Sequence, residues 1–242
     1  MVSNRLALLG RLSSRAAGFA ALCMAAVAAS VPVDGIAATA SVPASKVQAS
    51  KEPASKGPAS IVVLGDSLSA EYGLDRDTGW VALMRKRLAQ SAPDYNVVNA
   101  SISGETTTGG KTRLPAILAR VRPGVVIVEL GANDALRGIP LTLSTSNLGA
   151  IIESSQSAGA KVLVIGMRIP PNYGPDYAEH FFQTFAELAK QYRTAYVPFL
   201  LDGLVDDPSL FQADQIHPTA AAQPHMLDNV WPALKPMLKD AQ

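Results

Sequence analysis

The chain has 242 residues, 48% of them hydrophobic and 17% charged, and its net charge is +1. These values are typical of one globular domain with a sizeable core, and they exclude a wholly disordered chain. Residues 1–60 hold six Lys and Arg against two acidic residues, so the rest of the chain is slightly acidic. Because nucleic-acid binding relies on a basic surface, we expect no nucleic-acid partner.

Residues 1–40 have the pattern of a cleavable export signal. An apolar run over 16–29 precedes an Ala-Thr-Ala cleavage pattern at 38–40. The positive residues in front of the run are Arg5, Arg11 and Arg15. The run is shorter than the ~20 residues of a membrane span, so we predict a periplasmic or secreted protein with no stable membrane anchor, although an uncleaved anchor would share the pattern. Cys23 is the only cysteine and lies in this run, so the mature chain is predicted to lack disulfides and cysteine-based metal sites.

Residues 41–60 repeat a five-residue pattern, PASKV, QASKE and PASKG. Pro, Ala, Ser and Lys bury too little apolar surface to offset the conformational entropy of the chain, so this segment is predicted to be a disordered linker. Its lysines could instead bind an anionic surface, but a solubilising spacer explains them more simply.

The folded domain is predicted over 61–242, where strands and helices alternate. Short apolar, β-branched runs predict strands at 61–64, 96–99, 125–130, 161–165 and 195–198. Helical spacing of apolar residues predicts helices at 80–89, 114–121, 148–158, 177–191 and 219–238. This alternation indicates a parallel five-stranded sheet covered by helices on both faces, a three-layer α/β/α sandwich whose sites form at the carboxyl ends of the strands.

One predicted strand contains an acidic residue, and one predicted helix has an aromatic buried side. The strand at 125–130 is apolar except for Glu129. The helix at 177–191 is predicted to bury Phe181, Phe182, Phe185 and Leu188.

A serine follows the first predicted strand, in the sequence Gly-Asp-Ser-Leu-Ser at 65–69. There it would lie on a tight turn near a helix N-terminus, where Ser67 can act as a nucleophile and its own N–H can donate to an oxyanion. A serine in such a turn can equally cap a helix.

The turns after the second and third strands offer two further donors to an oxyanion. Gly104 has no side chain to obstruct its N–H, and Asn133 has a side-chain amide. A plain turn glycine and an Asx turn or helix cap would explain the same residues. The loop after the fourth strand, over 167–176, is predicted to bind the acyl part of a substrate at the same sheet edge, through Ile169, Pro170 and Tyr173.

Asp214 and His217 lie three residues apart in the sequence Asp-Gln-Ile-His-Pro. The aspartate can fix the tautomer of the imidazole, which can then take the proton of Ser67. A capping aspartate beside an exposed histidine is the alternative. The other two histidines, His180 and His225, lie in predicted helices, so His217 is the candidate base. A nucleophile, a base with its orienting carboxylate and three oxyanion donors are together what acyl transfer requires.

These segments resemble blocks I, II, III and V of the SGNH (GDSL) hydrolase superfamily, over about residues 60–240. The resemblance implies a flavodoxin-like fold without metal or organic cofactor. It implies the following roles: Ser67 as nucleophile, His217 as base, Asp214 as its partner, and the N–H groups of Ser67 and Gly104 with the Asn133 amide as oxyanion hole.

Four stretches are similar to the bacterial arylesterase, acyl-CoA thioesterase and lysophospholipase branch of that superfamily. They are GDSLSAEYG at 65–73, GWV at 79–81, LRG at 136–138 and IPPNYG at 169–174. Two positions depart from the branch: Ala132 stands where many members carry Gly, and Asp176 stands where a basic residue is common. The first departure leaves the predicted catalytic groups intact, whereas the second bears on substrate preference.

Other functions explain these residues less well. An inactive SGNH-like binding module would lack one of the catalytic residues, and a flavodoxin-like nucleotide binder would need a Gly-rich phosphate cradle in place of Asp66. An exported adhesion module would explain none of the residues at the strand ends. A carbohydrate O-deacetylase of the same superfamily is the closest alternative, although the apolar loop at 169–171 favours lipid-like acyl chains. We therefore predict a monomeric, exported serine esterase for aryl esters, acyl-CoA or lysophospholipids.

Overall fold

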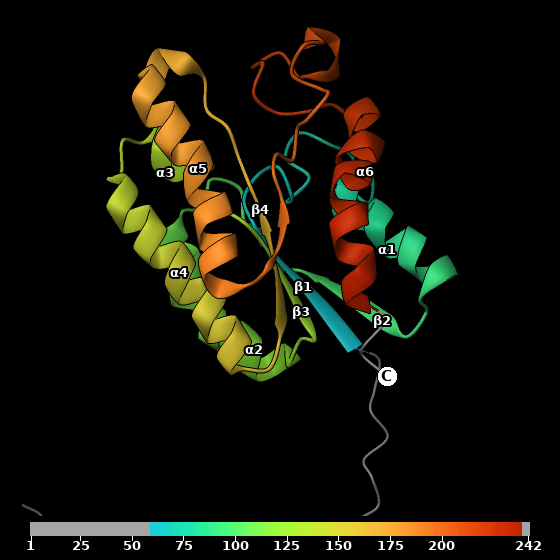
Figure 1. Ribbon diagram of the computed structural model, residues 1–242. Coiled ribbons are helices and arrows are strands. Elements are labelled where there is room, and N and C mark those ends of the chain that lie inside the picture. The colour runs from blue at the N-terminus through green and yellow to red at the C-terminus, as the bar shows by residue number, and fades with distance from the viewer. Residues whose placement is uncertain (1–58, 239–242) are drawn as a thin grey trace, which may run out of the picture. The chain divides into compact units, whose positions relative to one another are not determined.

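The computed structural model describes residues 59–238. The predicted export signal at 1–40 and the predicted linker at 41–60, except for its last two residues, lie outside this range. Five parallel strands form one sheet in the order β2-β1-β3-β4-β5 (Figure 1). They are β1 (Ala59–Gly65), β2 (Tyr95–Asn99), β3 (Val125–Glu129), β4 (Lys161–Ile165) and β5 (Ala195–Val197).

The sheet is covered by helices on both faces (Figure 1). Helices α1 and α6 pack together on one face, and α2, α4 and α5 cover the other. The α-helices are α1 (Trp80–Ser91), α2 (Thr107–Val121), α3 (Ala132–Leu136), α4 (Leu141–Ser157), α5 (Pro175–Tyr192) and α6 (Gln223–Leu234). Four 3-10 helices span Pro171–Tyr173, Pro208–Leu210, Ala220–Ala222 and Lys235–Leu238. The predicted three-layer α/β/α sandwich is thereby confirmed.

The chain order of the strands creates a switch point at the centre of the sheet. From β1 the chain moves outward to β2, then returns to add β3 on the opposite side of β1. The loop after β1 therefore leads to one face of the sheet and the loop after β3 leads to the other. This divergence opens a crevice at the carboxyl ends of the two strands. Ile61 pairs with Val97 on one side and Val125 on the other, so β1 lies in the middle of the core.

Two helices begin earlier than the sequence predicts. Helix α2 begins at Thr107 instead of 114, although it contains two glycines and a proline. Thr106 caps it by accepting a hydrogen bond from the Gly109 N–H, and the Asp134 carboxylate accepts from the Thr107 N–H at 2.9 Å. Gly110 allows the helix to approach the sheet closely, because a Cβ there would lie 2.4 Å from Leu130. Tertiary contacts thus override weak local helix propensity.

Helix α4 begins at Leu141 instead of 148, and α3 is not predicted at all. The early part of α4 is rich in Ser and Thr, which read as a loop in the sequence. In the fold, the Ser144 hydroxyl donates to Asp134 at 3.0 Å and the Asn147 amide donates to Thr107 at 3.2 Å. Buried hydrogen bonds between helices therefore replace the apolar periodicity that would have revealed this segment.

The buried side of α5 differs from the prediction at one residue. Phe181, Phe185 and Leu188 are buried, and the first two rings meet edge to face with centroids 5.1 Å apart. Phe182 is only half buried, because it faces the Arg168 guanidinium, which lies 3.5 Å from its ring centroid. Within residues 59–238, no helix has both the length and the apolar character that a membrane span requires.

Candidate active site

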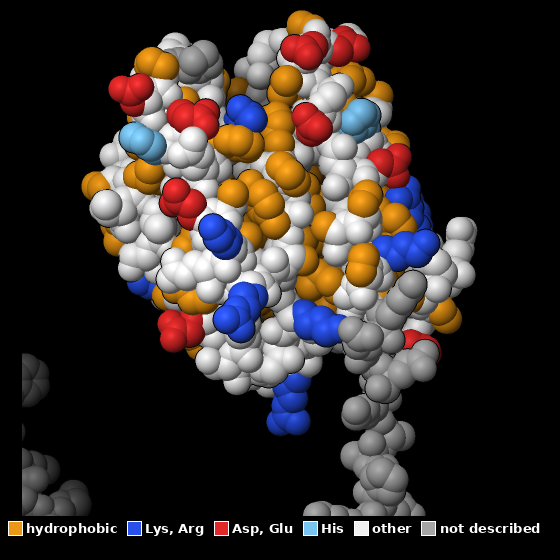
Figure 2. All heavy atoms as spheres, viewed as in Figure 1, with side chains coloured by type: hydrophobic (Ala, Val, Ile, Leu, Met, Phe, Trp, Pro, Cys, Tyr) orange, Lys and Arg blue, Asp and Glu red, His pale blue; other side chains and the backbone are white. Residues whose placement is uncertain are grey.

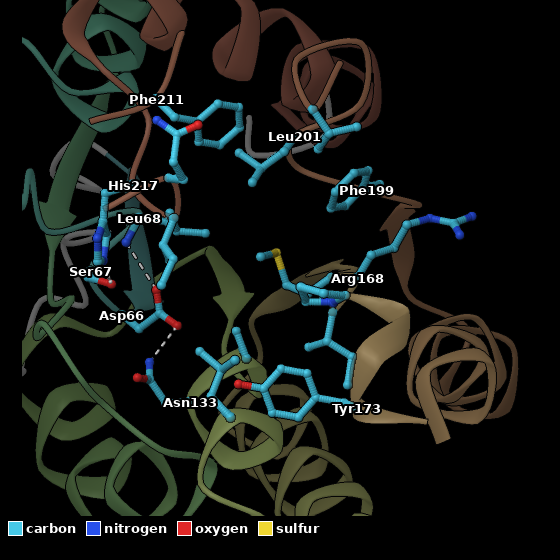
Figure 3. Close-up of a pocket in the computed structure, with 18 of the residues that line it drawn as sticks. Asp66, Ser67, Leu68, Asn133, Arg168, Tyr173, Phe199, Leu201, Phe211 and His217 are labelled. Atoms are coloured by element: carbon cyan, nitrogen blue, oxygen red, sulfur yellow. Dashed lines mark hydrogen bonds between the residues drawn. The ribbon is translucent and has the colours of Figure 1, made fainter. Parts of the chain in front are cut away.

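Ser67, His217 and Asp214 form a continuous series of hydrogen bonds at the carboxyl end of the sheet. Figure 3 shows the first two of these residues side by side. The Ser67 Oγ lies 2.9 Å from His217 Nε2, and His217 Nδ1 lies 2.7 Å from Asp214 Oδ2. Ser67 follows β1, whereas the other two residues lie in the loop before α6. A proton can therefore pass from the serine to the imidazole while the carboxylate faces the opposite ring nitrogen.

The loop that holds the histidine is fixed by its own hydrogen bonds. The Oδ1 atom of Asp214 accepts from the backbone N–H groups of Ile216 and His217, both at 3.0 Å. The Gln212 N–H donates to the His217 carbonyl at 2.8 Å, which closes the loop. Hydrogen bonds from the backbone and the ring of His217 lower the pKa of Asp214 to about 2. Asp214 thus caps the turn and also stays ionised beside the imidazole. The sequence offered capping and orientation of the histidine as alternatives, and in the structure Asp214 does both.

A tight turn presents Ser67. Gly65 must be glycine, because a Cβ there would lie 2.7 Å from the Glu129 carboxylate and 2.8 Å from Ser69. The next residue, Asp66, is buried and accepts from the Leu68 N–H at 3.0 Å, which bends the chain back over the end of β1. Ser67 is therefore left facing outward between two buried neighbours.

The three predicted oxyanion donors lie after three different strands, β1, β2 and β3. Asn133, in α3, donates one amide hydrogen to Asp66 Oδ2 at 2.9 Å, and its second amide hydrogen has no partner within the described residues. Gly104 lies after β2 and has a φ of +76°. Its carbonyl accepts from Arg137 at 2.8 Å, which holds the turn in place. Ser67 and Asn133 line the same cavity, and Gly104 is not part of its wall.

A cavity of about 700 Å³ opens beside Ser67 and His217. Figure 3 shows these two residues on one side and Tyr173 and Phe199 on the opposite side. The three residues predicted to contact the acyl group, Ile169, Pro170 and Tyr173, all line it. Figure 2 shows hydrophobic side chains gathered in the depression between the start of α5 and the loop before α6. Such a cavity suits an apolar substituent of a substrate that reaches Ser67.

Comparison with known proteins gives the family. The sequence pattern of the GDSL-like lipase/acylhydrolase family matches residues 63–223. The chain belongs to this family. Esterase TesA of Pseudomonas aeruginosa is 51% identical over 74% of this chain and 89% of its own. Thioesterase 1/protease 1/lysophospholipase L1 of Escherichia coli is 37% identical over 74% of this chain and 85% of its own. A crystal structure of TesA aligns with a TM-score of 0.72 at 51% identity, covering 74% of this chain and 99% of that one.

Membership in the GDSL family confirms the class of enzyme that the sequence predicted, an ester-hydrolysing serine hydrolase. The second departure from the branch, Asp176, lies in the first turn of α5 and does not line the cavity. The first, Ala132, lies on the cavity wall beside Asn133. Within residues 59–238, no three His, Cys, Asp or Glu side chains cluster as metal ligands would.

Several residues of this GDSL-family site were not predicted. Tyr72 packs against His217, with ring centroids 4.4 Å apart. Arg168 stacks on the half-buried Phe182, and Arg137 holds the Gly104 turn. The far wall of the cavity comes from the segments after β5: Phe199, Leu201, Val205, Pro208 and Phe211. These segments follow a strand of a parallel sheet, and that position is the signal that could have identified them.

Proposed function

We propose that the chain is an esterase that hydrolyses carboxylic esters or thioesters through an acyl-enzyme on Ser67. The observation that supports this most directly is the hydrogen-bonded series from Ser67 through His217 to Asp214. The similarity to an esterase and to a thioesterase and lysophospholipase supports the choice of bond.

In the first step, the Ser67 Oγ attacks the carbonyl carbon of the ester while its proton passes to His217 Nε2. The imidazolium is stabilised by the ionised Asp214 at the other ring nitrogen. The carbonyl oxygen becomes an oxyanion that accepts from the N–H groups of Ser67 and Gly104 and from the free amide hydrogen of Asn133. Collapse of this intermediate breaks the ester bond, and the leaving alcohol or thiol takes the proton from His217.

In the second step, water attacks the acyl carbon and gives its proton to His217. The same three donors hold the second oxyanion. Its collapse breaks the bond to Ser67, and the proton returns from His217 to the Ser67 Oγ. The products are a carboxylic acid and the regenerated enzyme, and no other reactant is required.

The cavity supports substrates with an apolar acyl or aryl group. Its wall combines the predicted contact residues Ile169, Pro170 and Tyr173 with the unpredicted aromatic residues Phe199 and Phe211. Aryl esters, acyl-CoA and lysophospholipids share an apolar substituent next to the scissile bond.

The remaining parts of the proposal rest on the sequence. The pattern of residues 1–40 supports export to the periplasm or beyond, with 41–60 as a spacer and no stable membrane anchor. We propose a monomer that needs no cofactor for the chemistry above.

The test is to treat the purified protein, from Ser41 onward, with a fluorophosphonate and to identify the modified residue by mass spectrometry. A phosphonyl adduct on Ser67, lost in Ser67→Ala together with ester hydrolysis, is the expected result. An adduct on another residue would overturn the assignment. A panel of p-nitrophenyl esters of varied chain length, acyl-CoA, lysophospholipid and acetylated sugars then identifies the substrate. Activity confined to acetylated sugars would identify a deacetylase.

A further inference from the structure

Two fully buried carboxyl groups lie beneath Ser67, and the reaction described above uses neither of them. Asp66 is 1% exposed and Glu129 is 0% exposed. They come from the ends of β1 and β3, the two strands at the switch point of the sheet. Buried ionisable groups are costly, so a pair of this kind beside a nucleophile calls for a chemical explanation.

The hydrogen bonds of Glu129 are distributed unequally between its two oxygen atoms. Its Oε2 accepts from the Asp66 N–H at 3.2 Å and from the Ser69 hydroxyl at 2.7 Å. Its Oε1 is buried and has no donor among the described residues. Because Glu129 Oε2 lies 3.2 Å from the Asp66 backbone nitrogen, Glu129 lies directly against Asp66. A carboxylate oxygen only accepts, so the buried Oε1 can make a hydrogen bond to a carboxylate only if it holds a proton.

The two carboxyl groups differ in what surrounds them. Asp66 has a donor at each oxygen, the Leu68 N–H at Oδ1 and the Asn133 amide at Oδ2, and both favour its ionised form. Both donors to Glu129 lie at Oε2, so its Oε1 has none. Burial and the neighbouring charge of Asp66 raise the pKa of Glu129 well above its usual value. The single proton of the pair therefore belongs on Glu129.

We propose that Glu129 is a positioning residue that works in its protonated form, its Oε1–H donating to the Asp66 carboxylate, which in turn holds the Asn133 amide in position for the oxyanion. Asn133 has two amide hydrogens, and fixing one on Asp66 Oδ2 fixes the direction of the other. The neutral glutamic acid also leaves only one negative charge beside the developing oxyanion. This inference rests on the proposed function, because it assigns a role in that reaction.

The test is a double-mutant cycle between Glu129 and Asn133, measured as kcat and KM on a soluble p-nitrophenyl ester. Asn133→Ala is expected to lower kcat by about 10²–10³ with little change in KM. Glu129→Ala is expected to lower kcat in the same way, and to cause little further loss when Asn133 is already Ala. Additive losses would overturn the proposal, since they would show that Glu129 acts independently of the amide.

The conservative variant separates this role from simple packing. Glu129→Gln keeps an oxygen for Asp66 N–H and Ser69 and an N–H for the Asp66 carboxylate, so it is expected to recover most of the kcat that Ala loses. Leu163→Ala is the matched control. Leu163 is fully buried in β4 and pairs with Ile127 of β3. Its apolar side chain makes no hydrogen bond to Asp66 or Glu129. Its loss should add normally to that of Asn133→Ala. A glutamine variant as weak as the alanine variant would overturn the proposal.

The proton itself can be observed without any measurement of activity, which also covers the case in which Glu129→Ala fails to fold. At neutral pH the wild-type protein should give the infrared C=O stretch of a protonated carboxylic acid, and Glu129→Gln should lack it. Absence of this band from the wild type would overturn the inference. Failure of the proposed function would appear differently, as a wild-type protein that a fluorophosphonate does not modify at Ser67.

Discussion

Asp214 is the residue whose substitution gives the most specific prediction, because each of its two carboxylate oxygens has a different task. Its Oδ1 closes the turn while its Oδ2 faces the imidazole. Asp214→Asn keeps an acceptor for the turn but removes the charge and favours the wrong tautomer of His217. We expect kcat to fall by up to about 10⁴, and to fall further in His217→Ala, which lacks the base altogether.

The control for this comparison is Asp207→Asn. Asp207 lies in the same loop region and caps a 3-10 helix by accepting from the Ser209 N–H and hydroxyl, without contact to His217. Its variant should retain kcat. Small, equal losses from Asp214→Asn and His217→Ala would show that the hydrogen-bonded pair is structural.

The buried Asp66 predicts a pH dependence of stability. Burial, partly offset by hydrogen bonds from Leu68 and Asn133, raises the pKa of Asp66 from 3.8 to about 6. The folded state therefore holds this proton more tightly than the unfolded state, so the contribution of the group to the free energy of unfolding is greatest below pH 3.8 and falls as the pH rises towards 6. Asp66→Asn has no such proton to lose. The free energy of unfolding of Asp66→Asn minus that of the wild type should therefore increase as the pH rises from 3.8 to about 6.

Urea unfolding of both proteins at several pH values between about 4 and 7 measures this difference. Parallel curves would show that Asp66 ionises as easily in the folded protein as in the unfolded chain. The pKa of Glu129 is raised as well, for the same reason of burial, so its contribution falls in the same direction at higher pH.

The single residues that the sequence could predict are those whose chemistry stands out within a short motif. Ser67, Asn133 and the Asp214–His217 pair were predicted in this way, and the structure brings them together. Tyr72, Arg137 and Glu129 were not assigned to the site. Their importance comes from neighbours that are distant in the sequence, such as the His217 ring 4.4 Å from Tyr72.

At the scale of the secondary-structure elements, the strands were predicted to within two residues of their observed bounds, because apolar β-branched runs are a local signal. The starts of α2 and α4 were missed by seven residues each. Both starts depend on Asp134, which accepts hydrogen bonds from Thr107 and Ser144 and so joins the two helices. No periodicity within either helix contains that information.

The loop between β4 and α5 carries a prediction about substrate length. Ile169 lines the cavity and is 8% exposed. If an acyl chain packs on it, each methylene contributes about 0.8 kcal/mol at most, roughly fourfold in kcat/KM. Ile169→Ser should therefore lower kcat/KM progressively as the acyl chain lengthens, and should leave acetyl esters nearly unchanged.

Ile117→Ser is the matched control for this substitution. Ile117 lies in α2, is 7% exposed and does not line the cavity beside Ser67. It should lower the melting temperature without changing the chain-length profile. A flat profile for Ile169→Ser, with a lowered melting temperature, would show that the loop only supports the fold.

At the scale of the whole molecule, the described elements that build the site begin with β1, at Ala59. The first of these elements, β1, is paired along its length, with β2 on one side and β3 on the other. The residues before it are predicted to be an export signal and a spacer. A protein that begins at residue 53 should consequently have the melting temperature and the kcat/KM of one that begins at Ser41.

A protein that begins at residue 63 tests whether the start of β1 is needed for the fold. It lacks Ala59–Val62, so it loses the pairing of Ile61 with Val97 and Val125 and two fully buried side chains, Ile61 and Val62. Burial of such side chains contributes roughly 1.5–3 kcal/mol each, a large part of the net stability of a domain. We expect circular dichroism to show an unfolded or strongly destabilised protein for the start at 63 and a native one for the start at 53. Reduced kcat/KM on soluble esters for the start at 53 would instead show that the segment at 41–52 contributes to the site, and the spacer interpretation would then be wrong.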